Sequence, residues 1–348
     1  MRVALDAMGG DHAPGEVVRG AVMAARRFGG DGVHVLVVGQ EAVVRQELQA
    51  TPGGDDAMLP ITVVHAPDVI GMDDHAAHAA RRQRQSSIHV GLRLVRDGEA
   101  DAFLSAGNSG ATMATAVLTL RPLPGVDRPA IGAVFPLPSG QTIIVDVGAN
   151  ADCQPHHLVD FAYLGAAYME SVFGMQHPRV GLLSNGEEAS KGNRLVQETH
   201  PMLTECGLNF VGNVEGRDAT SGAADVVVCD GFAGNVVLKL AEGMVALIFD
   251  LIRGAVRSRL HYRLAGLILR PALRRAGRRL DYREYGGAPL LGVRGLVFIA
   301  HGRSDAAAIA SGIRAAHEAA ERGLLDHITT QLAARPARTA STTAEASS

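Results

Sequence analysis

The sequence is poor in cysteine, in aromatic residues and in long apolar runs. Cys153, Cys206 and Cys229 form no CxxC pair, which argues against a disulfide framework or a zinc site and fits a reducing cytoplasm. Aromatic residues are 4% of the chain and tryptophan is absent, so we expect a core of Ala, Val, Leu and Ile. No apolar run reaches the roughly 20 residues of a membrane-spanning helix. The N-terminus becomes acidic and glycine-rich too early for a signal peptide.

Several familiar binding motifs are also missing. No GxGxxG follows an expected strand and no GxxxxGK[ST] occurs, so neither a dinucleotide site nor a P-loop is indicated. The segment "GNSGA" (107–111) lacks the second glycine of GxSxG, so Ser109 is not placed as a nucleophile. His156, His157 and the scattered acids lack metal-ligand spacing, and we expect neither a metal nor a cofactor. The net charge of -3 gives no sign of nucleic-acid binding.

Lysine is almost absent. Among 33 basic residues, Lys191 and Lys239 are the lysines, and every other one is arginine. A genome-wide preference for arginine could leave these two lysines by chance. Alternatively, these two positions need a compact ammonium that a guanidinium cannot replace.

Short apolar runs alternate with helical stretches along most of the chain. The expected strands span 2–8, 33–39, 61–67, 100–106, 130–135, 141–147, 179–185, 209–214, 224–230 and 295–300. Continuous apolar runs are typical of strands buried on both faces of a parallel sheet. Amphipathic segments such as 14–28 and 86–98 are expected helices. The alternation of strands and helices predicts a doubly wound α/β fold.

Six expected strands end in loops rich in Gly, Asn, Asp, Glu or Lys. These loops are Gly9–His12, "AGNSGA" (106–111), "GANADCQP" (148–155), "GEEASKGN" (186–193), "EGRD" (215–218) and "GFAGNVVLK" (231–239). In open α/β sheets, ligands bind at the carboxyl ends of the strands. We therefore expect the six loops to converge on one cleft. The turn at 107–111 enters a helix, whose N-terminus suits an anion such as phosphate.

A strongly basic helical segment follows the last of these loops. Residues 251–280 contain nine arginines and no acid, so the rest of the chain carries -3 - 9 = -12. Apolar residues recur at helical spacing from Leu247 to Leu269, and Pro271 interrupts them. This pattern predicts a protruding amphipathic helical pair that binds anionic lipid or an acidic protein. An ordinary solvated helix face with a dimer contact is the alternative.

Together these loops resemble a known family. The segments "LDAMGGDHAP", "SAGNSGA", "VDVGAN", "GLLSNGEEASKGN", "GNVEGRD", "VVVCDGFAGNVVLK" and "YGGAPLLGV…AHG" are similar to those of the bacterial acyl-[acyl-carrier-protein]:phosphate acyltransferases. The resemblance covers Arg2 to about residue 318. One departure is "RRQRQSSI" (81–88), where Gln83 and Gln85 stand in a run that is often lysine-rich in the family.

The resemblance implies a fold, an activity and partners. The fold is a three-layer α/β/α sandwich with a mainly parallel sheet, like isocitrate dehydrogenase and phosphotransacetylase. The enzyme moves a fatty acyl group from acyl carrier protein to inorganic phosphate, and the acyl phosphate serves phospholipid synthesis. Members are cytoplasmic homodimers that associate peripherally with the membrane, where a membrane acyltransferase acts next. Neither a metal nor an organic cofactor is implied.

We assign candidate roles on this basis. Residues 1–333 form one catalytic domain with a helical excursion at about 243–284, and 334–348 form a disordered tail. The candidate catalytic residues are Lys191, Lys239, Asn108 and Asn235. The candidate substrate-binding residues are Asp6, Gly9, Gly10, Asp11, His12, Gly107, Ser109, Gly110, Asp146, Asn150, Glu187, Asn193, Arg217 and Asp230. The candidate contacts to membrane or carrier protein are Arg253, Arg257, Arg259, Arg263, Leu267, Ile268, Arg270, Arg274 and Arg275.

Three alternatives stay open at this point. An acyltransferase that uses acyl-CoA shares the phosphopantetheine thiol of the carrier, so the sequence does not separate the two donors. A non-catalytic scaffold of lipid enzymes would depend on the basic helices alone. A decarboxylating dehydrogenase of the related fold would need a carboxylate cluster and a nucleotide site.

Overall fold

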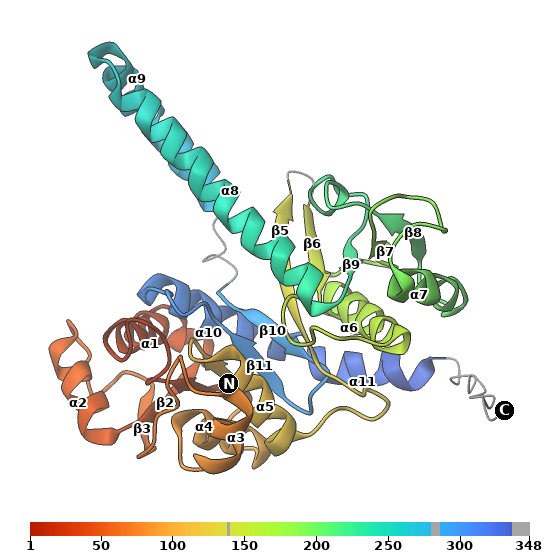
Figure 1. Ribbon diagram of the computed structural model, residues 1–348. Coiled ribbons are helices and arrows are strands. Elements are labelled where there is room, and N and C mark those ends of the chain that lie inside the picture. The colour runs from red at the N-terminus through yellow and green to blue at the C-terminus, as the bar shows by residue number, and fades with distance from the viewer. Residues whose placement is uncertain (138–139, 280–285, 336–348) are drawn as a thin grey trace.

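The computed structural model describes residues 1–137, 140–279 and 286–335. Its middle layer is an 11-stranded sheet with strand order β3-β2-β1-β4-β11-β10-β5-β6-β9-β7-β8 (Figure 1). The strands are β1 (Arg2–Asp6), β2 (His34–Gly39), β3 (Ile61–His65), β4 (Ala102–Ser105), β5 (Ala130–Leu137), β6 (Gly140–Val145), β7 (Val180–Leu183), β8 (Phe210–Val214), β9 (Val226–Val228), β10 (Ala288–Leu291) and β11 (Leu296–Ile299).

Helices cover both faces of the sheet, because successive strand residues point to opposite sides. On β1, Val3 and Leu5 enter one core cluster while Ala4 enters the other. The first cluster is covered by α1 (Gly15–Phe28), α2 (Glu41–Ala50), α6 (Pro155–Phe173), α7 (Arg194–Glu205), α10 (Ala306–Glu321) and α11 (Leu324–Ala334). The second is covered by α3 (Ala76–Arg82), α4 (Ser87–Arg96), α5 (Ser109–Leu120) and the start of α8 (Gly231–Arg257). The expected three-layer α/β/α sandwich is confirmed.

The strands of the sheet run in two directions. β5 is antiparallel to both of its neighbours, β10 and β6. β1, β2, β3, β4 and β11 are parallel to one another, and β6, β9, β7 and β8 run the opposite way. The loops after β1 and β4 therefore leave one edge of the sheet, and those after β6, β7, β8 and β9 leave the other. That the six loops form one cleft stays a prediction, and the loop after β9 does reach the other group, since Lys239 and Asp11 both act on His301.

The sequence reading missed β10. Its four residues, Ala-Pro-Leu-Leu, form a run too short to stand out, and Pro289 disfavours a strand. The strand pairs antiparallel with both β11 and β5. It therefore joins the two halves of the sheet.

The helical arm is present and long. α8 leaves the sheet, and α9 (Leu260–Arg279) returns along it, so the pair projects well beyond the sandwich (Figure 1). α8 already begins at Gly231, before the expected start of the excursion. Among the described residues, no helix is long and apolar enough to cross a membrane.

The expected tail begins two residues too early. Ala334 is the last residue of α11, and Arg335 forms an ion pair of 2.6 Å with Asp160, which is 1% exposed. The remainder of the expected tail, 336–348, lies outside the described residues.

Candidate active site

The loops after β1, β4 and β11 form one group of contacts at the carboxyl ends of these strands, which we call the first edge; the carboxyl ends of β6, β7, β8 and β9 are the second edge. The Asp11 amide donates to the carbonyl oxygen of Gly302 (2.7 Å). A Cβ on Gly9 would lie 2.7 Å from the amide nitrogen of Gly107, so no side chain fits there. The glycines of this turn therefore let three loops approach at backbone distance. Gly10 lies beside them, and His12 is exposed at the rim.

The buried Asp6 side chain holds this group of loops through hydrogen bonds. It is 1% exposed, and its carboxylate accepts the Ser105 hydroxyl (2.6 Å) and the Met8 amide (3.1 Å). Burial raises the pKa of Asp6, although these hydrogen bonds oppose the shift. Asp6 is thus placed to hold the turn rather than to meet a ligand.

The N-terminus of α5 opens at the same edge. The Asn108 side chain accepts the Ala111 amide (3.0 Å) as a helix cap, and its amide group points at the carbonyls of Gly71, Met72 and Asp74. Asn108 therefore caps α5 with its oxygen and holds the 71–74 loop with its amide group. Ser109 is exposed next to it, and the first amides of a helix have no partner within the helix.

Two cations lie at this edge. Lys239 on α8 and Arg303 both help to lower the pKa of His301, after its burial, while Glu242 and Asp11 oppose the shift. Lys239 is 55% exposed, with its Nζ 3.4 Å from Glu242. The Nδ1 atom of His301 accepts the Arg303 amide (3.2 Å). α8 thus begins at the second edge and carries Lys239 to the loop after β11 at the first.

Sequence reasoning missed two residues of this group, Met72 and Arg303. Met72 is 43% exposed, and its Cε would lie 3.0 Å from a Cβ on Gly302. Arg303 follows the "AHG" motif directly, which was the signal available for it. Met72 lies in a polar loop whose place beside Gly302 no local pattern indicates.

At the second edge, Asp146 holds a network of backbone bonds. Its carboxylate accepts the amides of Ile131, Gly148, Ala149 and Asn150, and also the Asn150 side chain (2.9 Å). Burial raises the pKa of Asp146. Asp230 caps α8 through the Ala233 amide (2.7 Å). Asn235 is exposed one turn further, 3.8 Å from where a Cβ on Gly148 would lie.

The loops after β7 and β8 form the outer part of the second edge. Asn193 caps α7 through the Val196 amide (3.0 Å). Arg217 contacts Glu187 (3.2 Å) and Glu215 (3.0 Å), so much of its charge is balanced. Lys191 is exposed and makes no ion pair with any described residue.

One group among the described residues could hold a metal ion. Ligand atoms of Asp127, His156 and His157 lie within 4.8 Å of one another. His157 Nδ1 accepts the Gln154 amide (3.0 Å) as part of a capping box, which places the proton of the neutral ring on Nε2. His157 would have to give up this bond to become a metal ligand, so the fit is poor.

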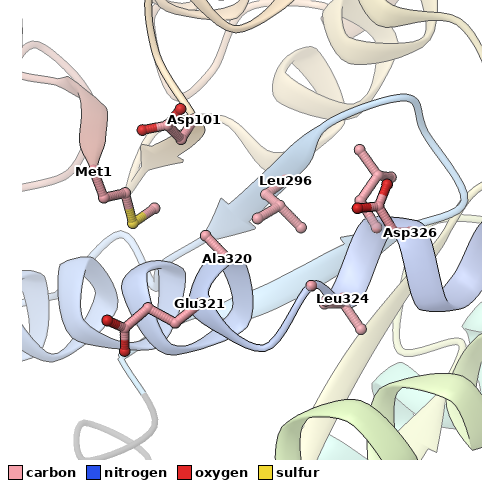
Figure 2. Close-up of a pocket in the computed structure, with 9 residues that line it drawn as sticks. Met1, Asp101, Leu296, Ala320, Glu321, Leu324 and Asp326 are labelled. Atoms are coloured by element: carbon pink, nitrogen blue, oxygen red, sulfur yellow. The ribbon is translucent and has the colours of Figure 1, made fainter.

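A cavity of about 420 Å³ lies away from all of these groups. It is lined by Met1, Asp101, Leu296, Ala320, Glu321 and Gly323–Asp326 (Figure 2). Met1, Asp101 and Leu296 lie at the starts of β1, β4 and β11, the edge opposite Asp6. None of the predicted site residues lines it.

On the arm, the described contact residues are exposed. Leu267 is 63% and Ile268 is 81% exposed. Arg253 pairs with Asp250 (2.5 Å), and Arg263 donates to the Arg257 carbonyl (3.1 Å). Arg259 and Arg270 are also exposed. The side chains of Arg274 and Arg275 lie outside the described residues.

Known structures share this fold. A phosphotransacetylase from Streptococcus pyogenes superposes with a TM-score of 0.59 at 18% identity, covering 92% of this chain and 94% of that one. A 4-hydroxythreonine-4-phosphate dehydrogenase from Klebsiella pneumoniae gives 0.54 at 14% identity, with 94% and 97% covered. The fold class is therefore the phosphotransacetylase-like α/β sandwich.

Sequence comparison identifies the family. The model of the family described as "Fatty acid synthesis protein" matches residues 1–327. A phosphate acyltransferase from Geotalea daltonii is 48% identical over 332 residues, covering 95% of this chain and 94% of its own. One from Geobacter sp. strain M21 is 50% identical over 324 residues, with 93% and 90% covered. The chain belongs to this family, and it is an acyltransferase whose acceptor is phosphate.

Proposed function

We propose that the chain transfers a fatty acyl group from acyl carrier protein to inorganic phosphate, and that the acyl phosphate enters phospholipid synthesis. The observation that carries the proposal is that the loops after β1, β4 and β11 lie together, that α5 begins in the loop after β4, and that Lys239 and Arg303 both act on His301 after β11. Helix amides and cations together form an anion site.

The proposed reaction is a direct displacement. An oxygen of bound hydrogen phosphate attacks the thioester carbonyl carbon, and the C–O bond forms as the C–S bond breaks. The carrier thiolate leaves and takes a proton from solvent, so no acyl-enzyme intermediate is formed. Catalysis then rests on positioning the two substrates and on stabilising negative charge.

We assign different tasks to the candidate residues. Lys239 neutralises phosphate, with Ser109 and Gly110 donating backbone amides. Asn108 acts as a positioning residue through the loop it holds. Lys191, Asn235 and Arg217 support substrate binding from the second edge. The buried Asp6, Asp146 and Asn150 keep the turns in place.

The arm serves association. Its exposed apolar residues and arginines favour peripheral contact with an anionic membrane from the cytoplasm. There a membrane acyltransferase would receive the acyl phosphate. A homodimer is expected through the exposed apolar face of α8.

The test is phosphate-dependent thiol release from palmitoyl-acyl carrier protein, with the acyl phosphate trapped by hydroxylamine. Palmitoyl-CoA is run in parallel to separate the two donors. Release from neither donor by folded protein would overturn the proposal and favour a scaffold.

The two lysines provide a sharper test of the site. Lys239→Met is expected to raise the KM for phosphate about tenfold, because one charge–phosphate contact is lost. Lys191→Ala is measured beside it. Near-wild-type turnover and phosphate KM in Lys191→Ala would exclude its assigned role without touching that of Lys239.

A further inference from the structure

A second basic surface lies in the sandwich itself. Residues 75–96 contain five arginines and no acid, although the chain outside 251–280 is acidic overall. Arg81, Arg82 and Arg84 are exposed in this stretch, and we call these three residues the α3 patch. None of them forms an ion pair with a described residue, whereas Arg96 pairs with Asp97 (2.8 Å).

The α3 patch is adjacent to the candidate anion site. Ala76, the first residue of α3, has its Cβ 3.0 Å from where a Cβ on Gly110 would lie. Asn108 ties the preceding loop to α5 through the Asp74 carbonyl (3.0 Å). Arg82 is six residues beyond Ala76, so it lies about 9 Å further along the helix axis.

The backbone beneath the patch is held firmly. The Arg93 side chain donates to the Arg84 carbonyl (2.7 Å), and the Ser86 amide donates to the Gln83 carbonyl (3.0 Å). Asp68 pairs with this segment as an isolated β-bridge to Ser86. The three guanidinium groups are therefore presented by a fixed segment rather than by a loose loop.

Distance distinguishes this patch from the arm. Arg253 is the first arginine of the arm and lies 14 residues beyond Lys239, about 21 Å along α8. Arg257 lies 18 residues beyond it, about 27 Å. A phosphopantetheine arm is comparable in length to a five-residue extended chain, or roughly 18 Å. α9 brings the arm back toward Lys239, and Gly277 lies beside Phe249. The α3 patch starts closer still, about 9 Å along the helix from the Ala76–Gly110 contact, so docking there needs less reach than docking at Arg253 or Arg257.

We propose that the α3 patch is the docking surface for the acidic acyl carrier protein, which leaves the arm for the membrane and for dimerisation. The proposal rests on the proposed function and names where its donor binds. Charge complementarity supports it, because an acidic carrier helix would meet three exposed arginines beside the site that takes its thioester. Such contacts mainly raise the association rate and weaken with salt.

The test compares two matched charge reversals. Arg81→Glu/Arg82→Glu changes the patch, and Arg26→Glu/Arg27→Glu makes the same change of charge at two adjacent exposed arginines of α1, across the sheet. The first is expected to raise the KM for palmitoyl-acyl carrier protein about tenfold at low salt, and the second less than twofold. The difference should shrink as salt is added.

A carrier-free donor separates docking from chemistry. With the palmitoyl thioester of N-acetylcysteamine, Arg81→Glu/Arg82→Glu is expected to keep kcat/KM and the phosphate KM within twofold of wild type. An unchanged KM for the carrier donor would overturn the proposal. If the same variant then lost binding to phosphatidylglycerol vesicles, the patch would be a membrane contact instead. Equal losses on both donors would also overturn it. Failure of the wild type with every donor would instead overturn the proposed function.

Discussion

Two buried aspartates have the same task at opposite edges of the sheet. Asp6 is the last residue of β1 and Asp146 directly follows β6, and each accepts the amide two residues further on. Desolvation raises the pKa of both carboxyls, so each folded turn retains its proton to a higher pH than the unfolded chain does. Their burial therefore makes the free energy of unfolding depend on pH.

Asp6→Asn is expected to flatten the dependence of stability on acidity. The pKa of Asp6 in the folded chain lies above its ordinary value of 3.8, so the folded state binds more protons and the free energy of unfolding falls as pH rises. This loss is absent once the carboxyl is replaced. Urea unfolding of both proteins between about pH 4 and pH 7 measures it, and parallel curves would contradict the assignment.

At this scale the sequence predicts positions better than roles. Asp6 ends β1, and the connections after β4, β6, β7 and β9 contain Asn108, Asp146, Asn193 and Asp230. A turn rich in Asn, Asp and Gly looks the same whether its side chains cap a helix or face a ligand. Local pattern cannot separate the two because the partner atoms come from segments far along the chain.

The 71–74 loop and the N-terminus of α5 behave as one element. Three carbonyls of the loop surround the amide group of Asn108, while its oxygen caps the helix. A single side chain thus fixes the wall of the candidate site that carries Met72.

Two variants separate these contributions. Asn108→Asp keeps the capping oxygen and loses the donors, so we expect a loss of about 1 kcal/mol in the free energy of unfolding. Asn108→Ala loses both and is expected to cost about 2 kcal/mol. Chemical denaturation measures each. Equal losses would mean that the capping oxygen contributes nothing, and no loss in Asn108→Asp would mean that the carbonyl contacts contribute nothing.

Strand existence was predictable, and strand direction was not. Each apolar run quoted from the sequence contains a strand, because a continuous Val, Leu and Ile segment needs burial on both faces. Direction depends on how the connections cross the sheet. β10 is antiparallel to both β11 and β5, so β5 runs in the same direction as β11. The antiparallel pairing of β5 with β6 then reverses the second half of the sheet.

The whole molecule has an exposed apolar seam along α8. Val236, Leu240, Met244, Leu247 and Leu251 are 46–64% exposed and recur every three or four residues, which is the spacing of a coiled-coil interface. A second copy of the arm would bury this seam.

Leu247→Glu/Leu251→Glu is therefore expected to convert the proposed homodimer to a monomer. Two charges in a packed seam cost several kcal/mol per copy, and sedimentation velocity measures the result. Leu118→Glu, on the exposed side of α5 (55% exposed), is the control and should leave the assembly unchanged. A wild-type protein that sediments as a monomer would contradict the expectation directly.

α8 is one uninterrupted helix from the Asp146 turn, past His301, to the far end of the arm. A helix is stiff along its axis, so it works as a lever with its short end inside the candidate site. A bilayer or a second copy bound to the far end of α8 would therefore constrain the orientation of Lys239 in the candidate site. On the proposed function, a contact at the end of α8, about 27 Å from Lys239, would therefore influence how Lys239 faces phosphate.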